Sequence, residues 1–251
     1  MSKVIWGINP LLSALDTQPD QIEEIILEKK TLSGRKYRIL EKAKALGIPV
    51  KFWEREPFSP PKVPPKANTQ GVVAYLREFN YAELEDIEEL WLSRGETPLV
   101  IALDEVQDPQ NVGSILRVSD AFGVHGIVIP KHRACEITGT VIKVSAGSAF
   151  NIPIARVKNL KEALEFFQKR GLWILGLTHK TEKNIFEIDL TIPLLIIAGN
   201  EERGIRPTIL ERCDFLAKIP MIGKAESLNV SQATGIALYE VLRQRILAKS
   251  R

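Results

Sequence analysis

After Pro98, short apolar runs alternate with helical patterns, and this alternation constrains the fold more than any other feature of the chain. Runs rich in valine, isoleucine and leucine predict strands at residues 99–103, 126–129, 173–177, 194–198 and 215–219. Apolar residues at helical spacing predict helices at residues 112–122, 160–169 and 231–247. Strands that alternate with helices indicate an α/β fold with a parallel sheet. Because ligands of such sheets bind beyond the carboxyl ends of the strands, we expect a site in the segments that follow them.

A separate block of shorter patterns precedes this sheet. It has strand patterns at residues 4–6, 22–27, 50–53 and 72–75 and a helical pattern at residues 37–46. A further short helix is expected to have Asn9 as its cap and Pro10 at its first position. Prolines between residues 56 and 71 exclude regular structure and predict an exposed loop. Polar residues of this loop either meet RNA phosphates or simply belong to a proline-rich loop: Lys62, Lys66, Asn68 and Gln70.

The charge distribution suggests where the two blocks meet. Residues 76–96 carry 2 basic and 7 acidic side chains, whereas residues 1–75 and residues 97–251 each have a net charge of +4. We therefore predict a domain at residues 1–75, an acidic linker with a short helix at 76–96, and a second domain at 97–251. Basic blocks at both ends suit a polyanionic partner, although many soluble proteins share this balance.

Composition argues against several classes of protein. Cys135 and Cys213 form no C-x-x-C pair, so neither a disulfide framework nor a structural zinc site is expected. The three histidines lack the spacing of metal ligands, and no metal is predicted. The N-terminal sequence lacks the apolar run of a signal peptide, and no stretch approaches the length of a membrane span. We expect a cytoplasmic protein.

Three polar motifs follow predicted strands. The first, at residues 104–123, contains Asn111 before a helix and Arg117 between one and two turns inside it. The second, at residues 197–205, has Glu201 in a G-x-E-x-x-G turn. That turn differs from the dinucleotide G-x-G-x-x-G pattern, and no Walker-type phosphate loop occurs, so a nicotinamide or nucleotide-hydrolysing enzyme is disfavoured.

The third motif, at residues 219–233, joins the last strand to the last helix and contains Ser227 and Asn229. Serine and asparagine are preferred helix caps, so an ordinary capping role is one interpretation of these residues. A helix N-terminus also leaves N–H groups free to bind a ligand. The third motif taken alone favours a capping role, whereas its combination with the other two motifs favours a ligand-binding site.

In this order, N-x-G-x-x-x-R, G-x-E-x-x-G and I-P-M…E-S-L-N-V-S closely resemble the SpoU/TrmH group of SPOUT RNA methyltransferases, which methylate ribose 2′-hydroxyls. The resemblance continues through residues 143–160 and across the second block. The first block resembles the small L30e-like substrate-binding domain of that family, with WGINPLLSAL and NTQGVVA as its edges. This two-domain layout is similar to the type that modifies a guanosine of 23S rRNA, whereas the tRNA-modifying type more often carries terminal helical extensions.

The resemblance implies a SPOUT α/β domain with a deep C-terminal trefoil knot, and S-adenosylmethionine as cofactor. It assigns the cofactor pocket to Leu177, Thr178, Gly199, Ile219, Met221 and Leu228, with Asn229 at its edge. It places the catalytic groups at Asn111, Arg117, Glu201, Ser227 and Asn229. A guanidinium almost never deprotonates, so we expect Arg117 to stabilise the forming alkoxide rather than act as the base.

The family also implies an assembly. The last helix is apolar on most sides, which indicates that more than one side is buried. Relatives are homodimers in which the arginine can lie near the partner's active site. The expected partners are therefore 23S rRNA and a second copy of the chain. Two alternatives remain: a tRNA guanosine 2′-O-methyltransferase, and an L30e-like RNA-binding protein without catalytic activity.

Overall fold

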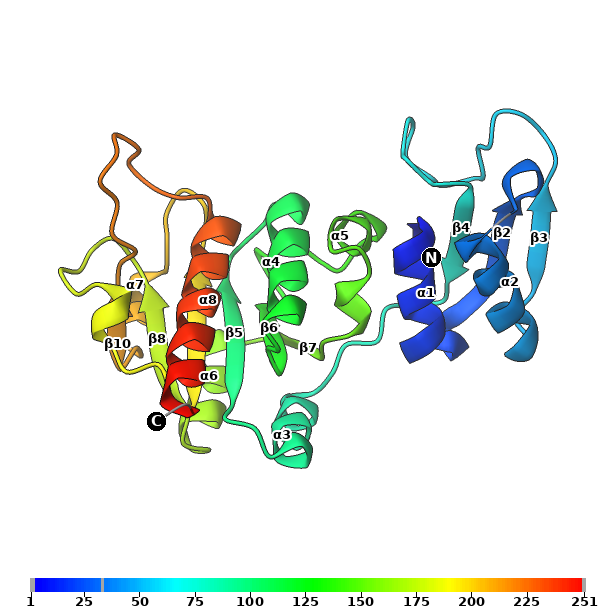
Figure 1. Ribbon diagram of the computed structural model, residues 1–251. Helices are drawn as coiled ribbons and strands as arrows, with labels where there is room; N and C mark the ends of the chain where they lie inside the picture. The colour runs from blue at the N-terminus through cyan, green and yellow to red at the C-terminus, as the bar shows by residue number, and fades with distance from the viewer. Residues whose placement is uncertain (1–2, 33, 250–251) are drawn as a thin grey trace. The chain divides into compact units, whose positions relative to one another are not determined.

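The computed structural model describes residues 3–32 and 34–249, which form two compact units. The first unit contains the chain up to Asn80 together with Glu136–Asn151. The second contains Tyr81–Cys135 and the chain from Ile152 onward. Each unit has its own sheet, so each is described by itself (Figure 1).

The first unit is a four-stranded sheet in the order β1-β4-β2-β3 with two longer helices. Strands β1 and β2 run antiparallel to β4, and β3 runs parallel to β2. Helices α1 and α2 pack on each other, and the unit buries Ile5, Leu11 and Ile39 completely. Its elements are β1 (Lys3–Trp6), α1 (Ile8–Thr17), β2 (Ile22–Glu28), α2 (Arg35–Ala45), β3 (Val50–Trp53), β4 (Val72–Leu76) and α5 (Gly139–Val144), with short 3₁₀ helices η1 (Pro19–Gln21), η2 (Lys29–Thr31) and η3 (Ser148–Phe150).

The expected start of the first helix needs correction. Helix α1 begins at Ile8 with Gly7 as its cap, so Asn9 lies inside the helix and accepts a bond from the Arg35 guanidinium (2.5 Å). Gly7 has φ 99°, a conformation that glycine adopts without strain and that allows the abrupt turn from β1 into α1. The first N–H of the helix, that of Ile8, donates to Gln70 Oε1 of the proline-rich loop (3.0 Å).

The proline-rich loop is mostly exposed, as predicted. It has no regular structure, but Phe58 and Val63 pack against Trp6, Ile26 and Val73 on the sheet. These apolar side chains hold the loop against a sheet face, while Lys62 and Lys66 lie in solvent.

The segment Glu136–Asn151 folds with the first unit, although it lies within the second block of the sequence. Helix α5 contacts β1, and a Cβ on Gly139 would overlap the carbonyl oxygen of Val4. Lys3 Nζ donates to the carbonyl of Ile137 (3.2 Å). Close backbone packing that only glycine permits therefore joins this segment to β1.

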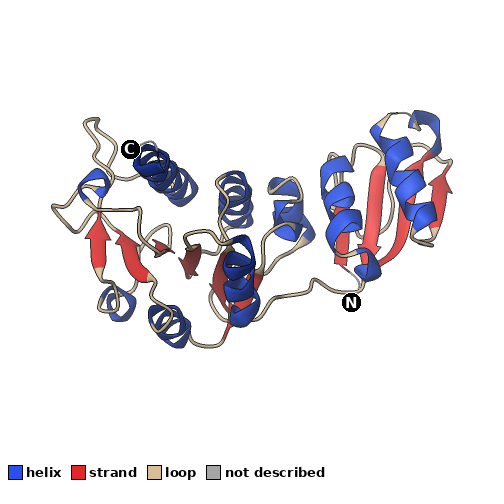
Figure 2. Ribbon diagram, turned by 60° about the horizontal axis from the view of Figure 1, so that its bottom comes forward, coloured by secondary structure: helices blue, strands red, loops and turns tan. Residues whose placement is uncertain are grey.

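The second unit confirms the predicted parallel sheet. Its six strands lie in the order β10-β8-β9-β5-β6-β7, and every neighbouring pair is parallel. Helices lie on both sides of these strands (Figure 2). Its elements are α3 (Leu84–Arg94), β5 (Leu99–Asp104), α4 (Pro109–Ala121), β6 (Gly126–Pro130), β7 (Ile154–Val157), α6 (Leu160–Gln168), β8 (Trp173–Leu177), η4 (Ile185–Glu187), β9 (Leu194–Gly199), α7 (Pro207–Leu210), β10 (Phe215–Ala217) and α8 (Val230–Lys249).

Helix α3 lies in the acidic stretch that the sequence marks as a linker. Its Ile87 and Trp91 are buried in the main core of the second unit, where Trp91 packs against Phe167. The charged residues of the stretch occupy the other side of the helix, so acidity here reflects the solvated face of a packed helix.

Three details of the second unit were not anticipated. Strand β7 was missed because it is only four residues long and contains Arg156. Helix α7 was missed because it has only four residues. Strand β10 ends at Ala217 instead of continuing to residue 219, and the residues after it line a cavity. Within the described residues, no helix is long and apolar enough to cross a membrane.

Candidate functional site

A cavity of about 360 Å³ lies at the carboxyl ends of β8, β9 and β10. This is the sheet edge at which a ligand site was expected. Of the seven residues that the sequence assigned to the cofactor, six line the cavity: Leu177, Thr178, Gly199, Ile219, Met221 and Leu228. Two of the predicted catalytic residues, Glu201 and Ser227, also line it.

The cavity combines apolar and charged walls. Leu177, Ile219 and Leu228 supply half-buried apolar surface. Its charged lining consists of three carboxylates, Glu201, Glu202 and Glu226, and three basic side chains, Lys180, Arg203 and Lys218. Such a cavity suits a ligand with a flat apolar part and charged groups.

The second motif forms a tight turn at the end of β9. Asn200 N–H donates to the Gly204 carbonyl (3.1 Å), and Gly204 N–H donates back to the Asn200 carbonyl (2.9 Å). A Cβ on Gly199 would overlap the backbone of Gly204 and Ile205. The expected close backbone approach is thus confirmed at Gly199, and the approaching segment is the far side of the same turn. Gly204 instead has open space at its Cβ position and a positive φ of 69°.

Asn111 links the three motifs by two side-chain hydrogen bonds. Its Nδ2 donates to Glu201 Oε1 (2.8 Å), and its Oδ1 accepts from Asn229 Nδ2 (2.8 Å). The Asn111 side chain is buried, with 7 % of the residue exposed. A buried amide that satisfies both neighbours fixes the relative positions of helix α4, the turn after β9 and the start of α8.

Asn111 and Asn229 sit at helix N-termini in different ways. Asp108 caps α4 by accepting from Gln110 N–H (3.0 Å), so Asn111 lies within the first turn and does not precede the helix. Asn229 Oδ1 accepts from Ser231 N–H (2.8 Å) and thereby caps α8, as the sequence predicted. Asn229 therefore serves as cap and as network member at once.

Arg117 and Ser227 stand apart from this network. Arg117 is exposed on α4 and is not among the residues that line the cavity. It has no hydrogen-bond or ion-pair partner within residues 3–32 and 34–249. Ser227 is exposed and lines the cavity, but in the same ranges its side chain makes no hydrogen bond.

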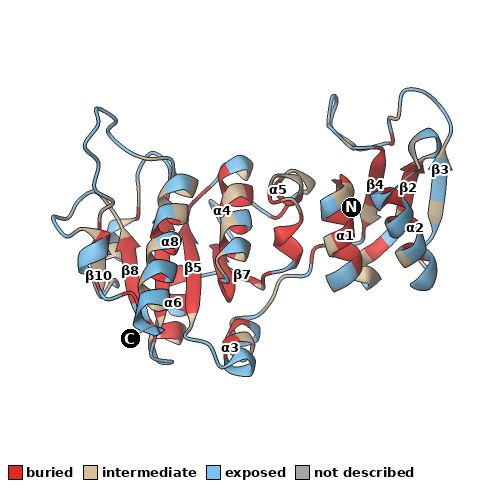
Figure 3. Ribbon diagram, viewed as in Figure 1, coloured by how far each residue is buried: buried red, intermediate tan, exposed pale blue. Residues whose placement is uncertain are grey.

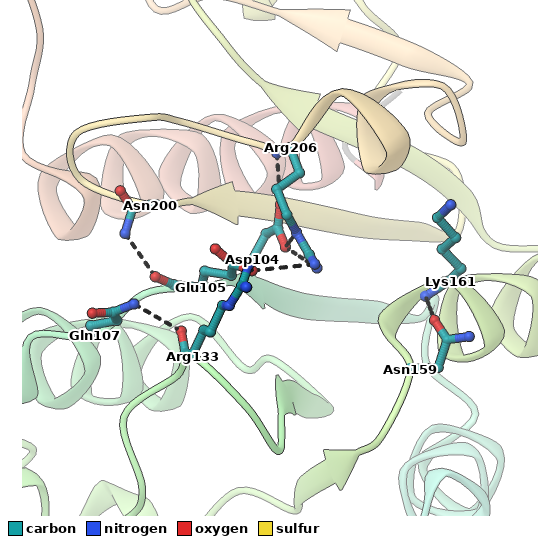
Figure 4. A network of polar contacts seen from close by, with 8 residues as sticks. All are labelled: Asp104, Glu105, Gln107, Arg133, Asn159, Lys161, Asn200 and Arg206. Atoms are coloured by element: carbon teal, nitrogen blue, oxygen red, sulfur yellow. Dashed lines mark hydrogen bonds and ion pairs between the residues drawn. The ribbon is translucent and has the colours of Figure 1, made fainter.

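Sequence reasoning missed the carboxylates at the end of β5. Asp104 is fully buried and accepts from Arg206 three times: from the backbone N–H (2.8 Å), from Nε (2.8 Å) and from a terminal nitrogen (2.6 Å). Burial alone would lower the pKa of Arg206, but Asp104 and Glu105 outweigh it and raise that pKa above its usual value. Asn200 Nδ2 donates to the Glu105 carbonyl (2.9 Å), so the turn after β9 is anchored to the end of β5 (Figure 4). An acidic pair directly after a predicted strand was the available signal.

The fold and the joined motifs are those of an RNA methylase domain preceded by a second module. The chain belongs to the SpoU rRNA methylase family, whose model matches residues 98–239. A model of RNA 2′-O ribose methyltransferase substrate-binding domains matches residues 4–82.

Individual relatives agree with this membership. The chain is 42 % identical to the 23S rRNA (guanosine-2′-O-)-methyltransferase RlmB of Coxiella burnetii, with 98 % of each chain covered. It is 38 % identical to the putative TrmH family tRNA/rRNA methyltransferase YacO of Bacillus subtilis, over 96 % of this chain and 95 % of that one. It also matches the crystal structure of the SpoU methyltransferase AviRb from Streptomyces viridochromogenes in complex with AdoMet, with a TM-score of 0.81, 27 % identity, and 97 % and 90 % of the two chains covered.

Proposed function

We propose that this protein is an S-adenosylmethionine-dependent RNA ribose 2′-O-methyltransferase whose substrate is a guanosine of 23S rRNA. The observation that carries the proposal is the Glu201–Asn111–Asn229 network beside a cavity lined by the motif residues. The name of the Coxiella burnetii relative, which matches along nearly the full length of both chains, supports the substrate.

The cavity fits S-adenosylmethionine in size and chemistry. Its volume of about 360 Å³ lies within the range of small-molecule sites. Leu177, Ile219 and Leu228 would hold the adenine, while the acidic and basic side chains of the lining would meet the charged groups of the cofactor. When bound, this cofactor supplies an activated methyl group for transfer to an oxygen.

The protein's own groups would prepare the acceptor. A ribose hydroxyl must lose a proton as the new bond forms, so the site must stabilise negative charge on the oxygen. Arg117 is the group suited to this, since its guanidinium stays protonated and can orient an adjacent phosphate as well. Glu201 is held by Asn111 and would position the motif loops.

Arg117 would act in a homodimer. Helix α8 buries Ala237, Leu238 and Val241 within its own unit but exposes a second apolar face (Figure 3). That exposed face consists of Ile236, Tyr239, Leu242, Ile246 and Leu247. Exposed apolar area of this extent is typical of an interface, and a partner packed there would bring a second α4 close to the cavity.

The dimer is tested by placing a charge on that face. Leu242→Glu should yield a monomer in sedimentation equilibrium, with methyl transfer lost and the far-UV circular dichroism unchanged. Lys249→Glu, at the end of the same helix, is the control and should remain dimeric. A wild-type chain that is monomeric at micromolar concentration would contradict the dimer.

The proposal also includes the domain roles. Residues 1–75 would be an L30e-like RNA-binding domain, 76–96 the connection, and 97–251 the catalytic domain with the family's trefoil knot. The substrate-binding model over residues 4–82 supports the first assignment. A cytoplasmic location follows from the proposed substrate.

The deciding experiment is methyl transfer from labelled S-adenosylmethionine to separated 23S rRNA, 16S rRNA and tRNA, followed by mapping of the modified ribose. Label in one guanosine 2′-oxygen of 23S rRNA is the expected result. The Bacillus subtilis relative is named for tRNA as well as rRNA, and label confined to tRNA would contradict our choice of substrate. RNA binding without any transfer would favour a non-catalytic RNA-binding protein.

A further inference from the structure

A second cavity, of about 250 Å³, lies at the carboxyl ends of β5, β6 and β7. Three separate parts of the second unit supply its basic side chains: His132 and Arg133 after β6, Lys158 and Lys161 around the start of α6, and Arg206 after β9. We call this cavity the basic pocket. Figure 4 shows Arg133 and Arg206 on one side of it and Asn159 and Lys161 on the other.

The basic pocket has a surplus of positive charge. Arg133, Lys158, Lys161 and Arg206 face a single lining carboxylate, Glu105, which leaves a formal charge of +3. The buried Asp104 behind Arg206 reduces this to +2. Glu105 is itself held between Arg133 (3.6 Å) and Arg206 (3.3 Å). The carboxylates of Asp104 and Glu105 are therefore already paired with the two arginines.

The two lysines of the pocket are not paired with carboxylates in the described part of the chain. Neither Lys158 nor Lys161 has an ion pair or a side-chain hydrogen bond in residues 3–32 and 34–249. Lys161 lies in the first turn of α6, where the helix dipole also attracts an anion. Two unpaired ammonium groups beside the guanidinium groups of Arg133 and Arg206 form a pocket for a group with several negative oxygens, and a phosphate has that chemistry.

The basic pocket adjoins the proposed cofactor cavity. The segment that leads from β9 into α7 separates them: Gly204 and Ile205 line the cofactor cavity, whereas Arg206 and Thr208 of α7 line the basic pocket. Both open at the carboxyl edge of one sheet. A polymer with a phosphate at every nucleotide can occupy both places at once.

We propose that the basic pocket binds a backbone phosphate of the RNA strand that carries the target ribose. This inference rests on the proposed function, because it takes the ribose to be at the cofactor cavity. Through this contact the pocket fixes the register of the strand, and it reads no base.

Lysine removal tests the proposal. Lys158→Ala/Lys161→Ala should raise the KM for RNA on the order of tenfold, as expected for loss of charged hydrogen bonds, with kcat and the Kd for S-adenosylmethionine unchanged. The slope of log KM against log salt concentration should become shallower by about 0.7 to 0.9 for each phosphate that the variant no longer neutralises. Lys158→Arg/Lys161→Arg should restore the KM. Lys169→Ala, at the other end of α6, is the control and should change neither quantity.

The measurements are made on whichever RNA the wild-type protein methylates, so an error in the choice of 23S rRNA does not affect them. If the wild type methylates no RNA, the proposed function fails, and the same variants are compared by RNA retention on filters. An unchanged KM, or unchanged retention, for the double alanine variant overturns the proposal. A further outcome is that inorganic phosphate raises the melting temperature of the wild type but not of the double alanine variant, while both have the same KM for RNA. That result would assign the pocket to a free anion and would also overturn the proposal.

Discussion

Asn111 donates a hydrogen bond to Glu201 across 90 positions of sequence, with 2.8 Å between Nδ2 and Oε1. The amide has one donor group and one acceptor group, and it uses them for the two other motifs. A carboxylate at this position could accept from Asn229 but could not donate to Glu201. The network therefore requires an amide.

Asn111→Asp should destabilise the protein by about 1–3 kcal/mol at pH 8, because it places two carboxylates in contact. Glu201→Gln in the same chain should recover much of this loss, since the amide introduced at position 201 can donate to the carboxylate introduced at position 111. Chemical unfolding of both single variants and the double variant gives the coupling free energy. Strictly additive changes would show that the two side chains do not interact.

Arg117→Lys should lower kcat about a hundredfold, since a lysine keeps the charge but loses the planar fork. Affinity for S-adenosylmethionine should not change, because Arg117 is absent from the cavity wall of its own chain. Arg212→Lys, at an exposed ion pair with Glu165, is the control. Near-normal turnover of Arg117→Lys would show that the reaction does not require a guanidinium at this position.

Gly199→Ala should destabilise the second unit by about 1–3 kcal/mol and weaken cofactor binding, because the added methyl group would overlap the backbone of Gly204 and Ile205. Gly223→Ala adds a methyl group with no heavy atom within 4 Å and should be nearly neutral. Thermal unfolding and cofactor titration check both variants. Equal melting temperatures would mean that the turn can shift at little cost.

Arg245 should be a major determinant of how α8 is anchored. Its guanidinium donates to four backbone carbonyls, those of Thr97, Pro98, Leu190 and Ile192. Burial lowers its pKa to about 10, so it remains charged at neutral pH. Removing it leaves these carbonyls without their donor.

Arg245→Met is therefore expected to cost about 2–4 kcal/mol of unfolding free energy in urea denaturation. Arg243→Met, two positions earlier on the same helix, removes only a pair with Glu240 on the helix surface and should cost less than about 1 kcal/mol. Similar losses for the two variants would rule out the anchoring role.

His125 should make the second unit less stable in mild acid. Its Nδ1 accepts the Leu99 N–H (3.1 Å), and its Nε2 lies 2.9 Å from Glu96 Oε2. Burial lowers its pKa, and the nearby Glu96 carboxylate only partly offsets this. As the pH falls, the unfolded chain therefore takes up the proton before the folded one does. The free energy of unfolding has its full value above the ordinary histidine pKa of about 6.5 and decreases as the pH drops below it.

This pH dependence is measured by urea unfolding between pH 8 and pH 5. His125→Asn, which retains an acceptor for Leu99, should flatten the decline. His132→Asn, at an exposed position, should leave the decline as it is in the wild type. A wild-type curve that is flat across this range would contradict the role of His125.

Local patterns predicted much of the second unit. Its strands are apolar on both faces, as in a buried parallel sheet, so their positions stand out in the sequence. Four of the six proposed cofactor residues lie at the end of a strand or within two residues of it: Leu177, Thr178, Gly199 and Ile219. Met221 and Leu228 lie in the loop that leads from β10 to α8, and all six line one cavity. Asn229 was recognised as a cap because capping depends on neighbours two residues away.

Contacts between distant segments could not be predicted in the same way. Asp104 and Arg206 are 102 positions apart, and neither has a local pattern that names its partner. The proline-rich loop showed its lack of regular structure but not the sheet face that Phe58 and Val63 cover. Arg117 has the spacing of its motif, yet its proposed place in a site depends on a second chain.

The return of Glu136–Asn151 to the first unit has a consequence for how such chains can be divided or recombined. The chain passes between the units after Asn80, after Cys135 and after Asn151. A single cut in the acidic stretch would leave α5 in the catalytic fragment without the strand it packs on. Relatives could therefore exchange substrate-binding modules only if the chain were joined at all three of these crossings. Helix α5 would then have to be exchanged together with β1.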